Sequence, residues 1–398
     1  MQHQMGFREF SLMMALLMSI VAFSIDAVLP GLGQISQDFS LNNANQAQWV
    51  IIAIFAGMTI GELIAGPMSD AIGRKRILFT GIGVYIIGTL MCYYVQSFEW
   101  FILGRFVQGL GVAGPHIASV ATVRDKYSGA HMARIMSLIM MVFMVVPAIA
   151  PSVGQVVIHF FGWRDIFILY LFYAALISIW VAMRLEESLI VEKRVPMRLS
   201  TFKDGFKQVI QHKTTRSYLL CVGLCYGAFV AYLGTSQQVF MQQFGKSGAE
   251  FSAYFALLAV FMGASSFLNS KMVLRFGMRK ISRVGMFIVS VMSLLFVVLQ
   301  IAGVQVGFNG FMLYAVILFF TLGAIFGNLN SIAMEPMGHI AGMASALINA
   351  VSSVLSLILA AIIGQLYDGT LVPLTGGFAL LFGLAFLLTI YEKRHAVA

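Results

Sequence analysis

Long stretches without a charged side chain alternate with short charged segments along the whole chain. Two such stretches run between Arg76 and Glu99 and between Arg216 and Lys246. A helix needs about 20 apolar residues to cross a bilayer, so each stretch predicts a membrane-spanning helix. The pattern predicts twelve spans, at about 9–33, 46–68, 77–97, 99–122, 134–158, 164–184, 217–240, 250–271, 281–302, 308–332, 340–364 and 373–391.

The composition excludes several classes of soluble protein. Hydrophobic residues make up 60% of the 398 residues and charged residues 10%, with a mean hydropathy of +0.89. Soluble domains are about 45–50% apolar and about 25% charged, so a cytosolic enzyme, a secreted disulfide scaffold and a disordered protein are excluded. The first span is not expected to be a signal peptide, because it carries an acid, lacks a small-residue cleavage site and precedes eleven more spans.

The three cysteines lie in apolar runs that contain neither a CxxC spacing nor a histidine; they are Cys92, Cys221 and Cys225. We interpret them as small core residues. The sequence therefore predicts neither a metal site nor a bound cofactor.

The lysines and arginines predict the orientation in the membrane. With the N-terminus inside, all but three of the 25 basic residues lie at the inner ends of the spans; Arg164 and Lys246 lie outside and Arg105 lies within a span. Such a bias marks the cytoplasmic face. We therefore expect an integral protein of a bacterial inner membrane with both termini in the cytoplasm. This placement explains the basic isoelectric point without a nucleic-acid partner.

One long polar segment divides the spans six and six. The predicted organisation is an N-terminal six-helix half at 1–184, a basic cytoplasmic linker at 185–216 and a C-terminal six-helix half at 217–398. Two such halves indicate an internal duplication, as in many secondary transporters. The expected fold class is an all-α membrane protein of twelve transmembrane helices.

Four ionisable residues fall inside predicted spans, namely Asp26, Glu62, Arg105 and His116. A charge inside a span costs about 2.5–3.5 kcal/mol on insertion scales, so each needs a structural or functional reason. At about 1.5 Å per residue, Asp26 and Arg105 share a depth in the outer half, and Glu62 and His116 can share one nearer the inner face. Arg105, Gln108 and His116 follow one helical face.

Each of these residues also has a purely structural interpretation. Asp26 can cap a helix break near Pro30, and Arg105 can brace backbone carbonyls. His116 can be a packing residue, and Glu62 can pair with a base at the inner face such as Arg124. The sequence leaves these alternatives open.

At the inner end of the second span, Gly66, Asp70, Gly73, Arg74 and Lys75 follow one another in fixed spacing. We expect the helix to end at its glycine and Asp70 to meet the N-terminus of a neighbouring helix, where an anion is favoured. The spacing resembles the G-x-x-x-D-x-x-G-R-K signature of the major facilitator superfamily. The resemblance implies a conformational latch rather than a substrate site.

Three further motifs resemble the Bcr/CflA-type drug:proton antiporters of that superfamily. The segment from Arg105 to Gly109 is similar to the R-x-x-Q-G motif of proton-linked members, and Asp26 to Pro30 resembles D-x-x-L-P. The third motif resembles the proline-rich antiporter motif of the fifth span and contains Pro147, Pro151 and Gly154. The resemblance implies that Asp26 carries a proton and that Arg105 sets its pKa. Glu62 and His116 belong to no motif that we can name, and they are the second candidate pair for proton coupling.

Polar side chains inside the spans are candidates for substrate contacts, because their polar atoms need partners or water. The candidates are Gln108, Tyr226, Tyr232, Gln237, Tyr254, Asn328 and Asn349. The 25 methionines are consistent with an adaptable interior.

These observations predict a monomeric, proton-coupled transporter that exports amphipathic organic compounds or drugs by alternating access and so confers antibiotic resistance. Its partners are a small organic substrate, protons and membrane lipid. An exporter of one metabolite or siderophore is the alternative. A membrane-embedded enzyme is disfavoured because the sequence lacks HExxH, GxSxG and Walker A motifs. A channel would not need two basic segments of this kind at the inner face.

Overall fold

The computed structural model describes residues 5–194 and 199–396. Within these ranges every regular element is a helix. The two chain ends, for which a cytoplasmic location is expected, lie outside the described residues, and so does part of the predicted linker.

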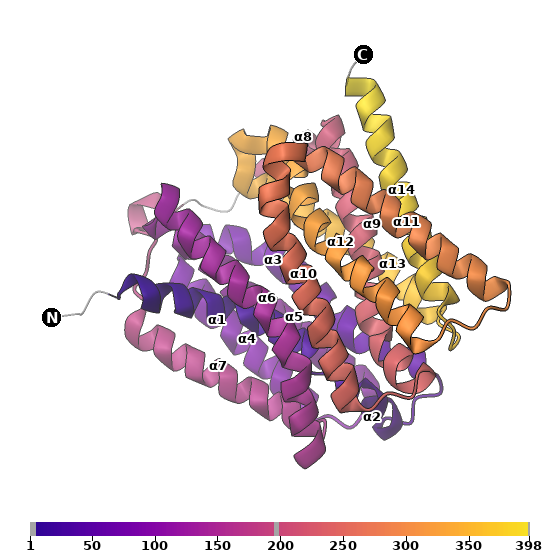
Figure 1. Ribbon diagram of the computed structural model, residues 1–398. Helices are drawn as coiled ribbons and strands as arrows, with labels where there is room; N and C mark the ends of the chain where they lie inside the picture. Colours follow the sequence, from indigo (N-terminus) through magenta and orange to yellow (C-terminus); the bar gives the residue numbers. More distant parts are fainter. Residues whose placement is uncertain (1–4, 195–198, 397–398) are drawn as a thin grey trace. The chain divides into compact units, whose positions relative to one another are not determined.

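The first part of the chain folds into seven α-helices and three short helical turns. They are α1 (Phe7–Asp26), η1 (Leu29–Gly31), α2 (Leu32–Asp38), η2 (Ala44–Gln48), α3 (Trp49–Ile72), α4 (Arg74–Tyr94), α5 (Phe98–Lys126), α6 (Gly129–Phe160), α7 (Asp165–Arg184) and η3 (Val191–Lys193). The second part contains α8 (Leu199–Gln211), α9 (Lys213–Gln237), η4 (Gln238–Gln243), α10 (Gly248–Phe276), α11 (Met278–Ile301), α12 (Phe308–Met334), η5 (Glu335–Ile340), α13 (Ala341–Gln365) and α14 (Val372–Ala396) (Figure 1).

The predicted spans agree with these helices. Eleven helical segments of the described chain are long and apolar enough to cross a membrane, and the shorter apolar segment Val145–Phe160 of α6 accounts for the twelfth. The first spanning segment, Phe7–Asp38, joins α1 and α2 through η1, where Pro30 stands at the start of the turn. The fold class predicted from the sequence is confirmed.

The segment predicted as a linker is more ordered than the sequence suggested. It contains η3 and the 13-residue helix α8. α8 packs on α13, because a Cβ at Gly205 would meet the side chain of Met343 and lie 3.4 Å from that of Leu347. The linker prediction missed this helix because hydropathy reports only the segments that a bilayer can hold.

The chain forms two compact units whose limits differ from the two sequence halves. Unit 1 comprises Met1–Asn42 and Ala53–Arg198, and unit 2 comprises Asn43–Ile52 and Leu199–Ala398. A ten-residue segment from the region between the first two spans therefore belongs to the second unit.

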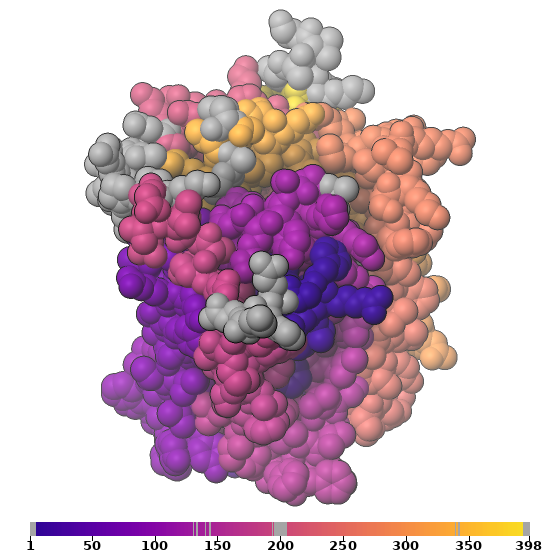
Figure 2. Space-filling view, turned by 90° about the vertical axis from the view of Figure 1, so that its left-hand side faces the viewer, coloured from indigo at the N-terminus to yellow at the C-terminus, as the bar shows by residue number. Residues whose placement is uncertain are grey.

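Within unit 1 the most extensive helix pair is α4 with α5. A Cβ at Gly81 would lie 2.6 Å from the carbonyl oxygen of Gly111 and 2.8 Å from the Cα of Gly114, so only glycine permits this approach. Small residues play this role in helix packing within membranes. α1 packs mainly on α6 and also on α7. Figure 2 shows the start of α1, in indigo, beside side chains of α6 and α7 in magenta and pink.

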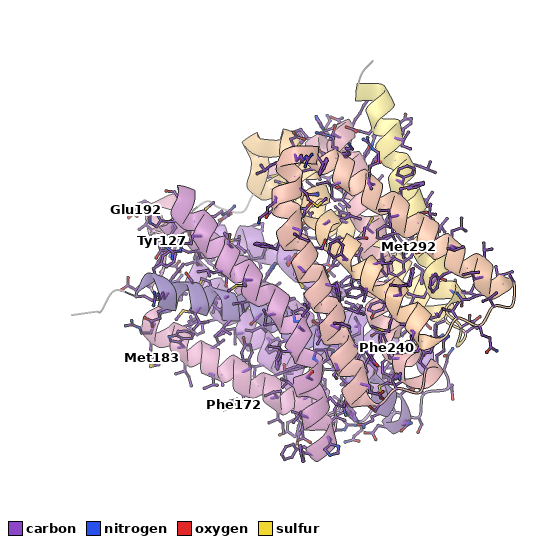
Figure 3. All side chains as sticks on the ribbon, viewed as in Figure 1. Tyr127, Phe172, Met183, Glu192, Phe240 and Met292 are labelled. Carbon is purple, nitrogen blue, oxygen red and sulfur yellow. The ribbon has the colours of Figure 1, made fainter. Side chains whose placement is uncertain are left out.

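Unit 2 is built from the pairs α9–α13, α11–α14 and α10–α12. Large apolar side chains cover the outward faces of both units, as expected for contact with lipid. Phe172 and Met183 on α7, for example, are 60% and 71% exposed (Figure 3).

Candidate functional site

The first element of the candidate site is the end of α1. Asp26 is the last residue of this helix and its residue surface is only 5% exposed. Within the described part of the chain its carboxylate forms no hydrogen bond and no ion pair. Asp26 therefore does not cap the break at η1, which was its structural alternative. A buried carboxylate without a compensating partner is costly and calls for a functional reason.

Arg105 on α5 is fully buried and holds the backbone of α1 in place. One guanidinium nitrogen donates to the carbonyl oxygen of Ser24 at 3.0 Å, and another donates to the side chain of Gln108. Gln108 donates in turn to Thr89 at 2.9 Å. The Tyr170 hydroxyl also donates to the Ser24 carbonyl, at 3.2 Å.

This network bears on the two interpretations of Arg105. The guanidinium braces a carbonyl two residues before Asp26, as the structural alternative proposed, and the described residues include no Arg105–Asp26 ion pair. Ser24 is held further by its hydroxyl, which lies 2.7 Å from the hydroxyl of Tyr85 on α4. Arg105 is therefore a positioning residue for the segment that carries Asp26.

The proline-containing motif of α6 touches the same segment. Pro147 and Pro151 lie inside α6, and Gly154 follows one turn later. A Cβ at Gly154 would collide with the backbone carbonyl of Ala27. The glycine thus lets the α6 backbone contact α1 immediately after Asp26.

Glu62 on α3 and His116 on α5 form a second pair. The Oε1 of Glu62 and the Nδ1 of His116 lie 2.8 Å apart. Their side chains are 17% and 23% exposed. The expected common depth of the two residues agrees with this contact. The partner of Glu62 in the structure is His116 and not Arg124, the alternative that the sequence left open.

An ion-pair cluster occupies the turn between α3 and α4. Gly73 has a φ of 111°, a conformation that favours glycine. Arg74 pairs with Asp70 and donates to Ser69 at 3.1 Å and to Asp125 at 2.8 Å. Of the predicted motif, Gly66 stands apart, because a Cβ there would meet nothing within 4 Å.

The anion at the N-terminus of α4 is Glu187, not Asp70 as the sequence suggested. Its two carboxylate oxygens accept the backbone N–H groups of Arg74 and Lys75, at 2.9 and 3.1 Å. Lys75 donates to the carbonyl of Leu185 at 2.6 Å, just beyond the C-terminus of α7. Both contacts match the helix dipole, which favours anions at N-termini and cations at C-termini.

Sequence reasoning missed Glu187 and Asp125. Asp125 stands between Arg124 and Lys126, and Glu187 follows Glu186 three residues after Arg184. An acid near a basic residue just beyond a predicted span was the signal that could have identified them.

The predicted substrate contacts do not gather in one place. Tyr226 and Tyr232 belong to an aromatic cluster of α9 and α12, in which Tyr232 lies 5.0 Å from Phe319 between ring centroids and Tyr226 lies 5.6 Å from Phe326. The hydroxyl of Tyr232 is buried and has no hydrogen-bond partner among the described residues. This cluster keeps Tyr226 and Tyr232 as candidates.

The other candidates lie in separate surroundings. Asn328 is committed to Asn269, with which it exchanges two hydrogen bonds of 3.0 Å between α10 and α12. Gln237 is buried and donates to the sulfur of Met241 at 3.6 Å, whereas Asn349 is exposed. Tyr254 packs on Phe308, with a centroid distance of 4.8 Å.

A cluster of neutral amides in unit 2 was not predicted. Gln48 donates to Gln238 at 2.8 Å, and Gln238 donates to Asn45 at 2.8 Å. Asn45 donates to the carbonyl of Tyr367 at 2.7 Å, and Gln365 donates to the Asn45 carbonyl at 3.0 Å. These bonds explain why Asn43–Ile52 belongs to unit 2.

The helices and the charged residues inside them define an integral membrane protein of the secondary-transporter type. The chain belongs to the Major Facilitator Superfamily, whose family model matches residues 14–361. It is a transporter and not an enzyme. It is 29% identical over 355 residues to the Uncharacterized MFS-type transporter YdgK of Bacillus subtilis, covering 88% of this chain and 87% of that protein.

A second relative and a solved structure extend the comparison. The chain is 27% identical to the Bicyclomycin resistance protein homolog of Haemophilus influenzae, covering 92% of this chain and 91% of that protein. The fold is similar to a crystal structure of a D-xylose-proton symporter, with a TM-score of 0.74 and 14% identity over 96% of this chain and 97% of that one.

Proposed function

We propose that this transporter exports amphipathic organic compounds, including drugs, in exchange for protons. Two findings support the export of drugs: the similarity over most of the chain to a protein named for bicyclomycin resistance, and the antiporter-type motifs at Asp26, Arg105 and Gly154. The protein acts in a bacterial inner membrane with both termini in the cytoplasm, because nearly all its basic residues lie at one set of helix ends. Export of one metabolite or siderophore is the alternative.

The observation that carries proton coupling is the buried, unpaired carboxylate of Asp26. An intramembrane carboxylate is expensive to keep charged, so a proton from the acidic side neutralises it. Arg105 holds the neighbouring carbonyl of Ser24 at 3.0 Å. In our proposal this is the separated arrangement of Arg105 and Asp26, and engagement of the two side chains later in the cycle restores the carboxylate and releases the proton.

The cluster around Arg74 takes the role of a conformational latch. Its ion pairs join the ends of α3, α4 and α5 to Glu187 beyond α7. All of its acids are engaged by basic side chains or backbone N–H groups. A substrate would have to displace these contacts, so the cluster fits a hinge better than a binding site.

Inverted membrane vesicles with an acidic interior test this function. A panel of drugs and metabolites is added, and uptake into vesicles containing the wild-type protein is measured with and without the pH gradient. We expect gradient-dependent accumulation of amphipathic compounds. Asp26→Asn should abolish accumulation and retain binding, whereas the exposed control Glu99→Gln should behave as wild type. Accumulation by Asp26→Asn would exclude Asp26 as the carrier, and the absence of any uptake by wild type would refute export.

A further inference from the structure

Glu62 and His116 are titratable residues that the proposed proton step does not use. Their facing atoms, Oε1 and Nδ1, are 2.8 Å apart. Both atoms are buried, and neither has a hydrogen-bond partner of acceptable geometry among the described residues. The two side chains are therefore close but poorly aligned for a hydrogen bond. Each keeps a polar atom that can still bind a ligand.

The position of Glu62 on α3 places it away from lipid. Ile60 and Ile64 are 44% and 45% exposed and mark the outward face of this helix. Glu62 is two residues from each, which at 3.6 residues per turn puts it about 200° around the helix axis. Glu62 thus lies on the face of α3 opposite these two residues, and its side chain is 17% exposed.

The backbone fixes the separation of the two helices that carry the pair. A Cβ at Gly61 of α3 would lie 2.7 Å from the carbonyl oxygen of Leu110, and a Cβ at Gly109 of α5 would collide with the carbonyl of Ile54. Close glycine contacts of this kind leave little room for the helices to shift. The acid and the imidazole are therefore held in place by packing rather than by their own interaction.

The face of α3 that carries Glu62 also carries apolar side chains one and two turns before it. Phe55 and Met58 precede Glu62 by seven and four residues and so lie on the same face of α3. The buried arginines of α4 and α5 are engaged elsewhere. Arg105 of α5 binds Ser24. At the inner ends, Arg74 of α4 binds Asp70 of α3 and Asp125 of α5. A single acid on a helix face that also carries an aromatic ring and a flexible thioether matches a cation with a hydrophobic body.

We propose that Glu62 is the recognition carboxylate for amphipathic organic cations, such as quaternary ammonium or phosphonium compounds, and that His116 is the partner the cation displaces. The assignment rests on the proposed export function and adds a substrate class to it. In the absence of substrate, His116 lies against the acid. A bound cation takes over the interaction with the carboxylate.

Two probes of similar chemistry and different charge test the assignment. Equilibrium binding of the cation tetraphenylphosphonium and of the neutral triphenylphosphine oxide is measured on the purified full-length protein in detergent. Wild type should bind tetraphenylphosphonium. Glu62→Gln should weaken that binding at least tenfold and change triphenylphosphine oxide binding less than twofold. Glu62→Asp, which keeps the charge, should retain more cation binding than Glu62→Gln, and His116→Gln should retain or increase it.

Several results would overturn the assignment. They are the absence of tetraphenylphosphonium binding by wild type, unchanged cation binding by Glu62→Gln, or parallel loss of both probes, which would mark a structural role. Size-exclusion profiles and thermal unfolding identify variants that fail to fold, and Glu62→Asp then carries the test. Because binding in detergent needs no pH gradient, it remains measurable if proton-driven export fails. Asp26→Asn should still bind tetraphenylphosphonium.

Discussion

Gly154→Ala tests whether the contact between α6 and the end of α1 sets the position of Asp26. The added Cβ would collide with the carbonyl oxygen of Ala27 and would lie 2.8 Å from its carbonyl carbon and 3.1 Å from its Cα. All three atoms are backbone, so no flexible side chain can move aside. α1 and α6 must separate, and the displaced segment begins directly after Asp26.

The size of the effect follows from these distances. Restoring ordinary van der Waals contact needs a shift of about 1.5 Å, and overpacking of this kind costs about 1–3 kcal/mol. For a unit of this size, 1 kcal/mol corresponds to about 2–4 °C in Tm, so the midpoint should fall by about 2–12 °C. A displacement near 1 Å at a reacting group can cost about 100-fold in rate, so gradient-driven uptake should fall at least about tenfold.

The assay combines thermal unfolding of the purified protein with uptake into inverted vesicles. Gly83→Ala is the matched control, because Gly83 lies in α4 and a Cβ there would meet nothing within 4 Å. This control should keep wild-type transport and an equal or slightly higher Tm, since alanine favours a helix over glycine. If Gly154→Ala matches wild type in both Tm and uptake, the close contact with Ala27 does not exist and the argument fails.

The remaining predictions concern the latch, the amide cluster and the topology. Asp70→Asn should slow uptake severalfold and leave equilibrium substrate binding intact; lost binding at unchanged Tm would instead place Asp70 in the substrate site. Glu187→Gln removes the anion at the α4 N-terminus, worth about 1 kcal/mol, and should lower Tm by about 2–4 °C; an unchanged Tm would contradict the capping role. Gly364→Ala should lower Tm because its Cβ would collide with the Gln48 side chain; if that collision is the cause, adding Gly364→Ala to a Gln48→Ala variant should cause little further loss. A fluorescent reporter fused after Ala398 should be active in the cytoplasm, and a periplasmic signal would reverse the topology.

The membrane spans could be predicted because a bilayer accepts only long apolar segments, and such segments can be recognised directly in the sequence. Charges end the apolar runs, and most predicted limits fall within a few residues of the helix ends. Two features were not predictable in this way. α8 is held by its packing on α13, and the polar segment Asn43–Ile52 joins unit 2 through hydrogen bonds of its amides. Both depend on tertiary partners, which hydropathy does not report.

The sequence predicted the depth of the ionisable residues along their helices, but it did not predict which groups they contact. Helical rise places Glu62 near His116, and the two side chains do meet. The same reasoning places Asp26 near Arg105, yet the guanidinium binds a backbone carbonyl. Depth along a helix fixes one coordinate of a side chain. The choice of partner depends on helix rotation and on exposed backbone groups, which is also why Glu187 rather than Asp70 occupies the N-terminus of α4.

The distribution of charge suggests that the two units contribute differently to transport. In the described chain, the intramembrane residues Asp26, Glu62, Arg105 and His116 all belong to unit 1. The buried polar contacts within the spans of unit 2 include neutral pairs such as Asn269 with Asn328. Neutral amides keep their charge state across the physiological range, so such pairs cannot respond to a proton gradient. If transport is proton-coupled, unit 1 offers two titratable sites inside its helices. The unpaired acid at the end of α1 and the acid–imidazole pair of α3 and α5 provide separate groups for the proton and for a cationic substrate.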